Sequence, residues 1–220
     1  MNNLRGIIFD FDGTLADSLP LCILSFQLSL EKITGKKYTE KEIIQHFGKS
    51  EEGIIASLAA EYYDEALQAF IETYKNNHHL CPNVFDGIIE ILDELKNKGI
   101  KLALITGKGK HTIDIALEYM NLKKYFEYVE HGSPYGIIKA ECMSKIAGLW
   151  NVNPSQIAYI GDQPSDITES KKAGVVSVAV SWAKTSNYNE LLEHSPDFLF
   201  TEISEFSKFS RRFLMSGLTR

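Results

Sequence analysis

The sequence predicts an α/β protein whose core is a doubly wound, mostly parallel sheet with an inserted α-helical unit. Two observations carry this prediction. Short apolar runs that are typical of strands alternate with amphipathic segments that are typical of helices, which favours parallel strands joined by helices. Glycines also stand where helix C-caps belong, at Gly99 and Gly174.

The first expected strand is the apolar run at residues 7–9, which directly precedes Asp10. A run this apolar is typical of a buried strand in a parallel sheet. Five more strand-like runs come later in the chain, at residues 101–105, 126–130, 157–160, 175–181 and 198–200. Helical patterns separate them, so we expect each strand to cross over to a parallel neighbour.

Residues 16–81 are expected to form the inserted helical cap. Apolar residues recur there at helical spacing, as at Leu21, Leu24 and Leu28, and no strand-ending acid or glycine motif interrupts them. We therefore expect two units: a catalytic core made of residues 1–15 and 82–220, and a cap domain made of residues 16–81.

The end of the first strand carries the most informative motif. Asp10 and Asp12 lie one residue apart, and Gly13 can turn the chain so that the second carboxylate leaves the strand axis. One carboxylate can then attack as a nucleophile while the other handles a proton, which suits phosphoryl transfer through an aspartyl phosphate. Two adjacent anions need a cation, and Mg²⁺ prefers oxygen ligands of this kind. Because such residues are also ordinary turn formers, the assignment needs support elsewhere.

Two further strand ends supply that support. Thr106 and Gly107 close the run at 101–105, where a hydroxyl and a backbone N–H could hold phosphate oxygens. Asp162 closes the run at 157–160, with Asp166 four residues on, and these carboxylates could complete a metal site. Taken singly, Thr106 could equally be a strand-end cap and Asp162 a helix N-cap. Three polar strand ends in this order favour the functional interpretation.

The order DFDGTLADS, ITGK, a lysine and then GDQPSD resembles the haloacid dehalogenase superfamily of Mg²⁺-dependent phosphohydrolases. The similarity is greatest to the phosphoglycolate-phosphatase-like branch, whose Rossmann-like core carries a helical cap after the first motif. The resemblance implies Asp10 as nucleophile and Asp12 as acid/base, with the Asp12 backbone carbonyl on Mg²⁺. It implies Asp162 as the other metal carboxylate and Asp166 as a weaker or indirect ligand.

The same resemblance implies roles for two lysines, Lys139 and Lys49, and for the residues that bind the transferring phosphoryl group, Thr106 and Gly107. The third motif is a lysine that neutralises phosphate charge; we favour Lys139 over Lys145 because it opens an amphipathic segment at roughly the expected distance. Lys108 follows the second motif, and because the net charge of −6 repels an anionic substrate, we expect this lysine to attract it locally. Lys49 lies in a glycine-containing cap loop of the kind that relatives lower over the site, where it could pair with a substrate anion.

Composition limits the other possibilities. The chain has 220 residues, 44% of them hydrophobic, which suffices for an α/β core and a small second unit. Its net charge of −6 argues against a nucleic-acid partner. Its 3 cysteines form no C-x-x-C pair, so neither a disulfide framework nor a zinc site is indicated. We see no signal peptide and no apolar run of the roughly 18 residues that a membrane span needs, so we expect a cytoplasmic protein.

The predicted function is therefore Mg²⁺-dependent hydrolysis of a small, phosphoglycolate-like phosphomonoester. A sugar phosphomutase of the same superfamily would carry both acids and a cap, and the sequence leaves it open. A receiver-like signalling protein fits less well, because its phosphoaccepting aspartate would lie mid-chain. A 2-haloacid dehalogenase would not need Asp12. Phosphoglycolate, a sugar phosphate, a nucleotide and pyrophosphate all remain candidate substrates, and the oligomeric state cannot be derived.

Overall fold

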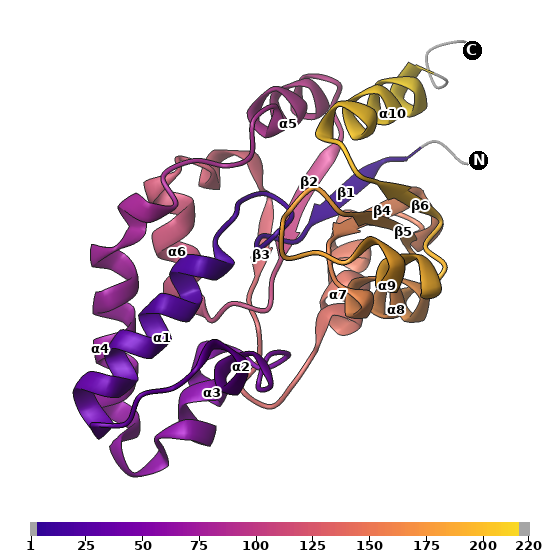
Figure 1. The fold of residues 1–220 in the computed structure, drawn as a ribbon. Coiled ribbons are helices and arrows are strands. Elements are labelled where there is room, and N and C mark those ends of the chain that lie inside the picture. Colours follow the sequence, from indigo (N-terminus) through magenta and orange to yellow (C-terminus); the bar gives the residue numbers. More distant parts are fainter. Residues whose placement is uncertain (1–3, 216–220) are drawn as a thin grey trace.

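The computed structural model describes residues 4–215, and its strands form one sheet in which every neighbouring pair is parallel (Figure 1). The strand order is β3-β2-β1-β4-β5-β6. The six strands of the described residues are β1 Gly6–Phe9, β2 Lys101–Ile105, β3 Tyr128–Glu130, β4 Ile157–Gly161, β5 Val176–Val180 and β6 Phe198–Phe200. The predicted doubly wound α/β fold is confirmed.

Helices fall into two groups. Four follow β1 and form the inserted unit: α1 Leu19–Thr34, α2 Glu40–Ile44, α3 Glu51–Leu58 and α4 Tyr63–Asn76. The others cover the sheet: α5 Ile88–Asn97, α6 Lys110–Tyr119, α7 Lys139–Trp150, α8 Pro164–Ala173, α9 Tyr188–Glu193 and α10 Ile203–Met215. No helix among residues 4–215 is long and apolar enough to cross a bilayer.

The period-two alternation of the strands builds a core on each face of the sheet. On β1, Ile7 and Phe9 pack in the larger apolar cluster with residues of α5, α6 and α10, whereas Ile8 packs with α7. Ring contacts fasten α10 to the edge strand, since Phe209 lies with its ring centroid 5.0 Å from that of Phe200. Figure 1 shows α5 and α10 on one side of the sheet, with α7 and α8 on the other.

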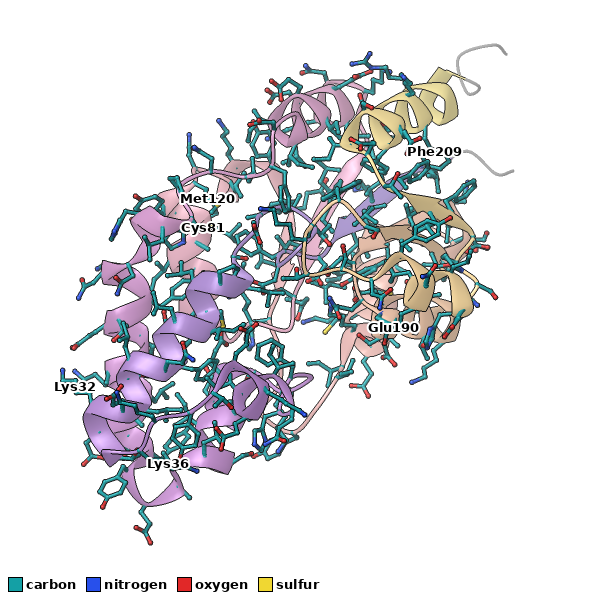
Figure 2. All side chains as sticks on the ribbon, viewed as in Figure 1. Lys32, Lys36, Cys81, Met120, Glu190 and Phe209 are labelled. Atoms are coloured by element: carbon teal, nitrogen blue, oxygen red, sulfur yellow. The ribbon has the colours of Figure 1, made fainter. Side chains whose placement is uncertain are left out.

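The inserted unit has an apolar cluster of its own. Helices α1 and α4 pack side by side, with the rings of Phe26 and Phe70 4.3 Å apart, and Ile43 and Ile55 from α2 and α3 complete the cluster. Figure 2 shows Lys32 and Lys36 at the end of this unit that lies farthest from the sheet. The observed helices agree with the helical pattern predicted for residues 16–81, and the division into two domains stays a prediction.

Strand register brings the predicted motifs to one edge of the sheet. Phe9 pairs with Leu104 on one side and with Ile160 on the other, so β1, β2 and β4 end at the same level. The residues that follow these ends therefore lie side by side. The order of the strands also reverses between β1 and β4, and in open α/β sheets that reversal opens the crevice in which ligands bind.

The cap and the core meet through a close backbone approach. A Cβ atom at Gly53 of α3 would overlap the backbone of Pro134, which lies in the segment between β3 and α7. Close by, the backbone N–H of Ser50 donates to the carbonyl oxygen of Ser133 at 2.9 Å. Glycine at position 53 thus lets the start of α3 lie directly on the core.

We predict that Gly53→Ala destabilises the chain although alanine favours a helix. The overlap with Pro134 should outweigh the propensity gain and cost about 1–3 kcal/mol. The matched control is Gly148→Ala in the exposed part of α7, where an added Cβ meets nothing within 4 Å and should stabilise by about 0.5–1 kcal/mol. Denaturant unfolding of both variants checks this, and a stabilised Gly53→Ala would contradict the close approach.

Candidate active site

Asp10 lies directly after β1 and is held in a buried position. Its backbone N–H donates to the carbonyl oxygen of Ile160 on β4, at 2.8 Å, and only 4% of the residue is exposed. One carboxylate oxygen, Oδ1, accepts the N–H of Phe11 at 2.8 Å. The other oxygen, Oδ2, accepts Lys139 Nζ at 2.9 Å. Both oxygens therefore have fixed directions at the carboxyl edge of the sheet.

Lys139 bridges two of the carboxylates. Its ammonium lies 2.9 Å from Asp10 Oδ2 and 2.7 Å from Asp166 Oδ1. Burial opposes a charge on this lysine, but the two carboxylates outweigh that effect and hold its pKa well above the usual range. Lys139 is therefore a permanent cation between Asp10 and Asp166.

Asp162 follows β4 and completes a group of three buried acids. Carboxylate oxygens of Asp10, Asp162 and Asp166 all lie within 4.8 Å of one another. Two glycines allow the three carboxylates to lie this close together. A Cβ at Gly13 would overlap the Asp162 carboxylate, and a Cβ at Gly161 would overlap the Asp166 carboxylate. Gly13 also needs its left-handed conformation, with φ +72°.

This trio fits a divalent cation on its own chemistry. Asp162 Oδ1 is buried with no hydrogen-bond partner among the described residues, and an orphaned carboxylate oxygen is costly unless a cation or another ligand satisfies it. Burial, followed by the charges of Asp10 and Asp166, raises the pKa of Asp162 well above its usual range. Burial likewise raises the pKa of Asp10 to about 7 despite Lys139. A hard cation with oxygen ligands would relieve this repulsion.

Asp12 is oriented by different partners. Its Oδ1 atom accepts the hydroxyl of Ser18 at 2.5 Å and Lys108 Nζ at 3.1 Å. Its Oδ2 atom takes no hydrogen bond from a residue that the structure describes. The side chain of Asp12 is therefore separate from the trio of acids, and the predicted contact of its backbone carbonyl with a metal stays a prediction.

The end of β2 provides donors for an anion. Thr106 is 1% exposed, and its hydroxyl oxygen accepts the N–H of Lys108 at 3.2 Å, which leaves the hydroxyl proton to donate elsewhere. The N–H of Gly107 donates to no backbone carbonyl among the described residues. These two groups lie beside β1, as the sequence predicts, and they suit the oxygens of a phosphoryl group.

The other two lysines that the sequence singles out lie elsewhere. Lys145 is exposed and pairs with Glu130 at 2.7 Å, on the surface. Lys49 donates to the hydroxyl of Ser57 at 3.1 Å, within the inserted unit. Of the two candidates for the third motif, Lys139 is thus the one that reaches Asp10 and Asp166. A role for Lys49 toward substrate stays a prediction.

Sequence reasoning missed two cap residues that reach the core. Glu51, at the start of α3, is 4% exposed and accepts the hydroxyl of Thr112 at 2.6 Å and the N–H of Gly109. Tyr74 of α4 places its ring 4.8 Å from Lys108 Nζ. Nothing in the local sequence distinguishes these two from other helix residues; only the packing of the cap on the core does.

His78 corrects one expectation. The pair at 78–79 could be taken for metal ligands, but adjacent helix positions face apart, and we expect a surface location near the cap hinge. His78 is instead fully buried, with its ring 4.4 Å from that of Tyr119 and 5.3 Å from that of Tyr74. Aromatic stacking keeps it inside, and burial lowers its pKa, which favours the neutral ring.

A profile of the haloacid dehalogenase-like hydrolases matches residues 7–180, which span every motif described above. The chain belongs to this family. The resemblance inferred from the sequence is thereby confirmed, and the family match makes the protein a hydrolase.

Relatives agree with the predicted enzyme class, a phosphatase. Pyrophosphatase PpaX of Bacillus mycoides is 26% identical over 209 residues, covering 92% of this chain and 94% of its own. Among solved structures, a predicted phosphoglycolate phosphatase from Haemophilus somnus superposes with a TM-score of 0.79 at 23% identity, over 96% of this chain and 99% of its own. A haloacid dehalogenase-like hydrolase from Streptococcus pneumoniae gives 0.77 at 24%, over 95% and 99%. At these identities the solved structures support the fold alone.

Removing the bridging lysine should separate its role from that of Lys145. We predict that Lys139→Ala lowers kcat by about 10²–10³, the effect of losing one preorganised donor, since its charge lies within 3 Å of Asp10. Lys145→Ala should be nearly silent. Steady-state rates of both variants, with circular dichroism to verify folding, make the comparison; equal losses would refute the assignment.

A second prediction concerns pH and the acidic trio. The pKa of Asp10 rises from 3.8 to about 7, so the folded chain holds the proton more tightly, and ionisation between those values lowers the free energy of unfolding. A bound divalent cation should offset that loss. The increase in Tm on adding Mg²⁺ should therefore be larger above pH 7 than near pH 5, by at least about 2–4 °C. This difference is the shift expected for ~1 kcal/mol in a chain of this size. Calorimetry in chelated and Mg²⁺-supplemented buffer checks this, with Asp162→Ala as the variant expected to lose the difference.

Proposed function

We propose that this chain is a Mg²⁺-dependent phosphatase that hydrolyses a small phosphomonoester through an aspartyl-phosphate intermediate. The observation that carries the proposal is the division of labour between the two acids of the first motif. Asp10 lies with Lys139 among the buried acids, while Asp12 lies apart with Ser18 and Lys108. A nucleophile and a separate proton carrier need such different surroundings.

In the first half-reaction, a carboxylate oxygen of Asp10 attacks phosphorus and the bond from phosphorus to the ester oxygen breaks. Asp12, in its protonated form, gives its proton to that leaving oxygen. Thr106 and Gly107 would hold the phosphoryl oxygens, and the ammonium of Lys139 would offset the negative charge beside Asp10.

In the second half-reaction, Asp12 takes a proton from water, whose oxygen attacks phosphorus. The bond between Asp10 and phosphorus breaks, phosphate leaves, and both carboxylates return to their starting states. Ser18 and Lys108 fix the direction of Asp12 from one side through Oδ1, so Oδ2 is the atom we assign to proton transfer.

Asp10, Asp162 and Asp166 would hold the cation, which when bound supplies positive charge to the phosphoryl oxygens and favours ionised Asp10. We assign Mg²⁺ because the set consists of hard carboxylate oxygens and lacks the cysteine and histidine that favour softer metals. The backbone carbonyl of Asp12 is the further ligand that the family resemblance suggests. Mn²⁺ also prefers oxygen ligands, and activity measured across a panel of divalent metals separates it from Mg²⁺.

A mutase is the second candidate, because a structure described as a candidate β-phosphoglucomutase from Thermotoga maritima shares the fold, with a TM-score of 0.71 at 23% identity. Both activities need the same two acids. They differ in whether water or a second hydroxyl accepts the phosphoryl group. Release of inorganic phosphate from a substrate panel, compared with formation of an isomeric sugar phosphate, separates them.

The central test is Asp10→Asn. We predict that this variant folds with unchanged circular dichroism and has no turnover, because an amide keeps the shape but cannot attack phosphorus. The measurement is phosphate release across phosphorylated metabolites with Mg²⁺, and Asp114→Asn, on the exposed face of α6, serves as the control. Hydrolysis by Asp10→Asn within tenfold of the wild type would overturn the nucleophile assignment.

A further inference from the structure

Glu51 is a cap carboxylate that occupies anion donors of the core. Its Oε1 accepts the hydroxyl of Thr112 at 2.6 Å, and its Oε2 accepts the N–H of Gly109, which precedes α6. Lys108 Nζ lies 3.8 Å from the same carboxylate. A hydroxyl, a backbone N–H and an ammonium group thus converge on one buried acid. This is the donor set that would otherwise bind an anion of the substrate.

The position of Glu51 relates it to the leaving group. Lys108 Nζ lies 3.1 Å from Asp12 Oδ1 and 3.8 Å from Glu51 Oε1, so one ammonium connects the two carboxylates. Because Asp12 is the proposed proton donor to the leaving oxygen, the leaving group must lie beside this connected set. The cap carboxylate therefore faces the part of the substrate that departs.

The charges of Asp12, Glu51 and Lys108 do not cancel. Lys108 is the one cation paired with Asp12 and Glu51 among the described residues, so the set carries more negative than positive charge. A carboxylate or second phosphate on the leaving group would lie against the Glu51 carboxylate. The hydrogen-bond donors that could bind such an anion are already occupied by Glu51. Like charges placed together at a buried contact oppose binding strongly.

Tyr74 adds an independent observation. The residue is fully buried, and its hydroxyl has no hydrogen-bond partner among residues 4–211. Its ring lies 4.8 Å from Lys108 Nζ, on the cap side of the same set. An unpartnered buried hydroxyl can donate to or accept from a neutral polar ligand, and it needs such a partner.

We propose that Glu51 is a specificity-determining residue: it selects phosphomonoesters whose leaving group carries hydroxyls and no second anionic group. Polyol and sugar phosphates belong to this class, whereas phosphoglycolate and pyrophosphate do not. The Glu51 carboxylate accepts a hydroxyl of the leaving group and the Tyr74 hydroxyl serves a second one, while a further anion is rejected. This inference rests on the proposed function and narrows its substrate.

The test compares leaving groups in Glu51→Gln, which keeps the shape and removes the charge. Glycerol phosphate represents the hydroxyl class, and phosphoglycolate and pyrophosphate represent the anionic class. We expect the wild type to favour glycerol phosphate, and Glu51→Gln to raise the ratio of kcat/KM, anionic over hydroxyl, by about tenfold or more. Glu65→Gln removes an exposed charge of α4, which forms no ion pair with Lys108, and should leave the ratio unchanged.

A binding measurement separates this inference from the proposed function. In the Asp10→Asn background, titration calorimetry gives Kd for glycerol phosphate and for phosphoglycolate without turnover, with and without Glu51→Gln. A wild type that turns over no phosphomonoester defeats the proposed function, yet the Kd ratio still tests Glu51. An equal change of Kd for both ligands would show that Glu51 only holds the cap against the core, and would overturn the proposal. Failure of both ligands to bind would also overturn it. Thr112→Val, which removes one donor to Glu51, replaces Glu51→Gln if that variant does not fold.

Discussion

Three carboxylates that meet at one edge of the sheet impose the constraint on which the rest of this structure depends. Asp10, Asp162 and Asp166 come from the ends of two adjacent strands and from the helix that follows the second. Their mutual repulsion and burial both oppose ionisation. Lys139 is the one cation paired with them among the described residues, and hydrogen bonds from Phe11 and Gln163 add to its effect. Electrostatic repulsion at the ends of the central strands thus lowers the stability of the folded state. Such a cost is retained where it is useful, which under the proposed function means the binding of a cation and a phosphoryl group.

Backbone geometry makes this density of charge attainable. Parallel register places the ends of β1 and β4 at the same level. The register alone therefore brings Asp10 and Asp162 next to each other. Gly13 and Gly161 then let the carboxylates of Asp162 and Asp166 approach to where any Cβ would clash. Sheet register sets the coarse position of the acids, and the glycines set the fine position. Replacing either glycine would therefore disturb the site without touching a charged residue.

Much of this core could be predicted from sequence because its signals are local. An apolar run that ends in an acid, at Asp10 or Asp162, indicates both a strand and the edge at which it ends. The identity of the bridging lysine was harder, since Lys139 and Lys145 lie on the same helix. Its buried location became evident only from the packing of α7 against the sheet.

The cap was predictable as helical but not in its contacts. Glu51 reaches Thr112 across 61 positions of sequence, and no periodic pattern encodes a pairing of that range. The same is true of His78, whose stacking on Tyr119 depends on how α4 and α6 lie together. Helical periodicity identifies which face of a cap helix is apolar. It does not identify which polar residue at the end of that helix will be buried against the core.

This difference has a functional meaning. Two lysines define two sides of the site. On the first side Lys139 forms an ion pair with Asp10, and on the second side Lys108 forms an ion pair with Asp12. Every residue on the first side belongs to the sheet edge or to the helices that follow it, whereas the second side includes Glu51 and Tyr74 from the cap. Chemistry that depends only on the core residues of both sides, Asp12 included, can persist while cap sequences change. On the proposal for Glu51, selection among leaving groups depends on the cap residues of the second side, so members of one family can share a mechanism and differ in substrate.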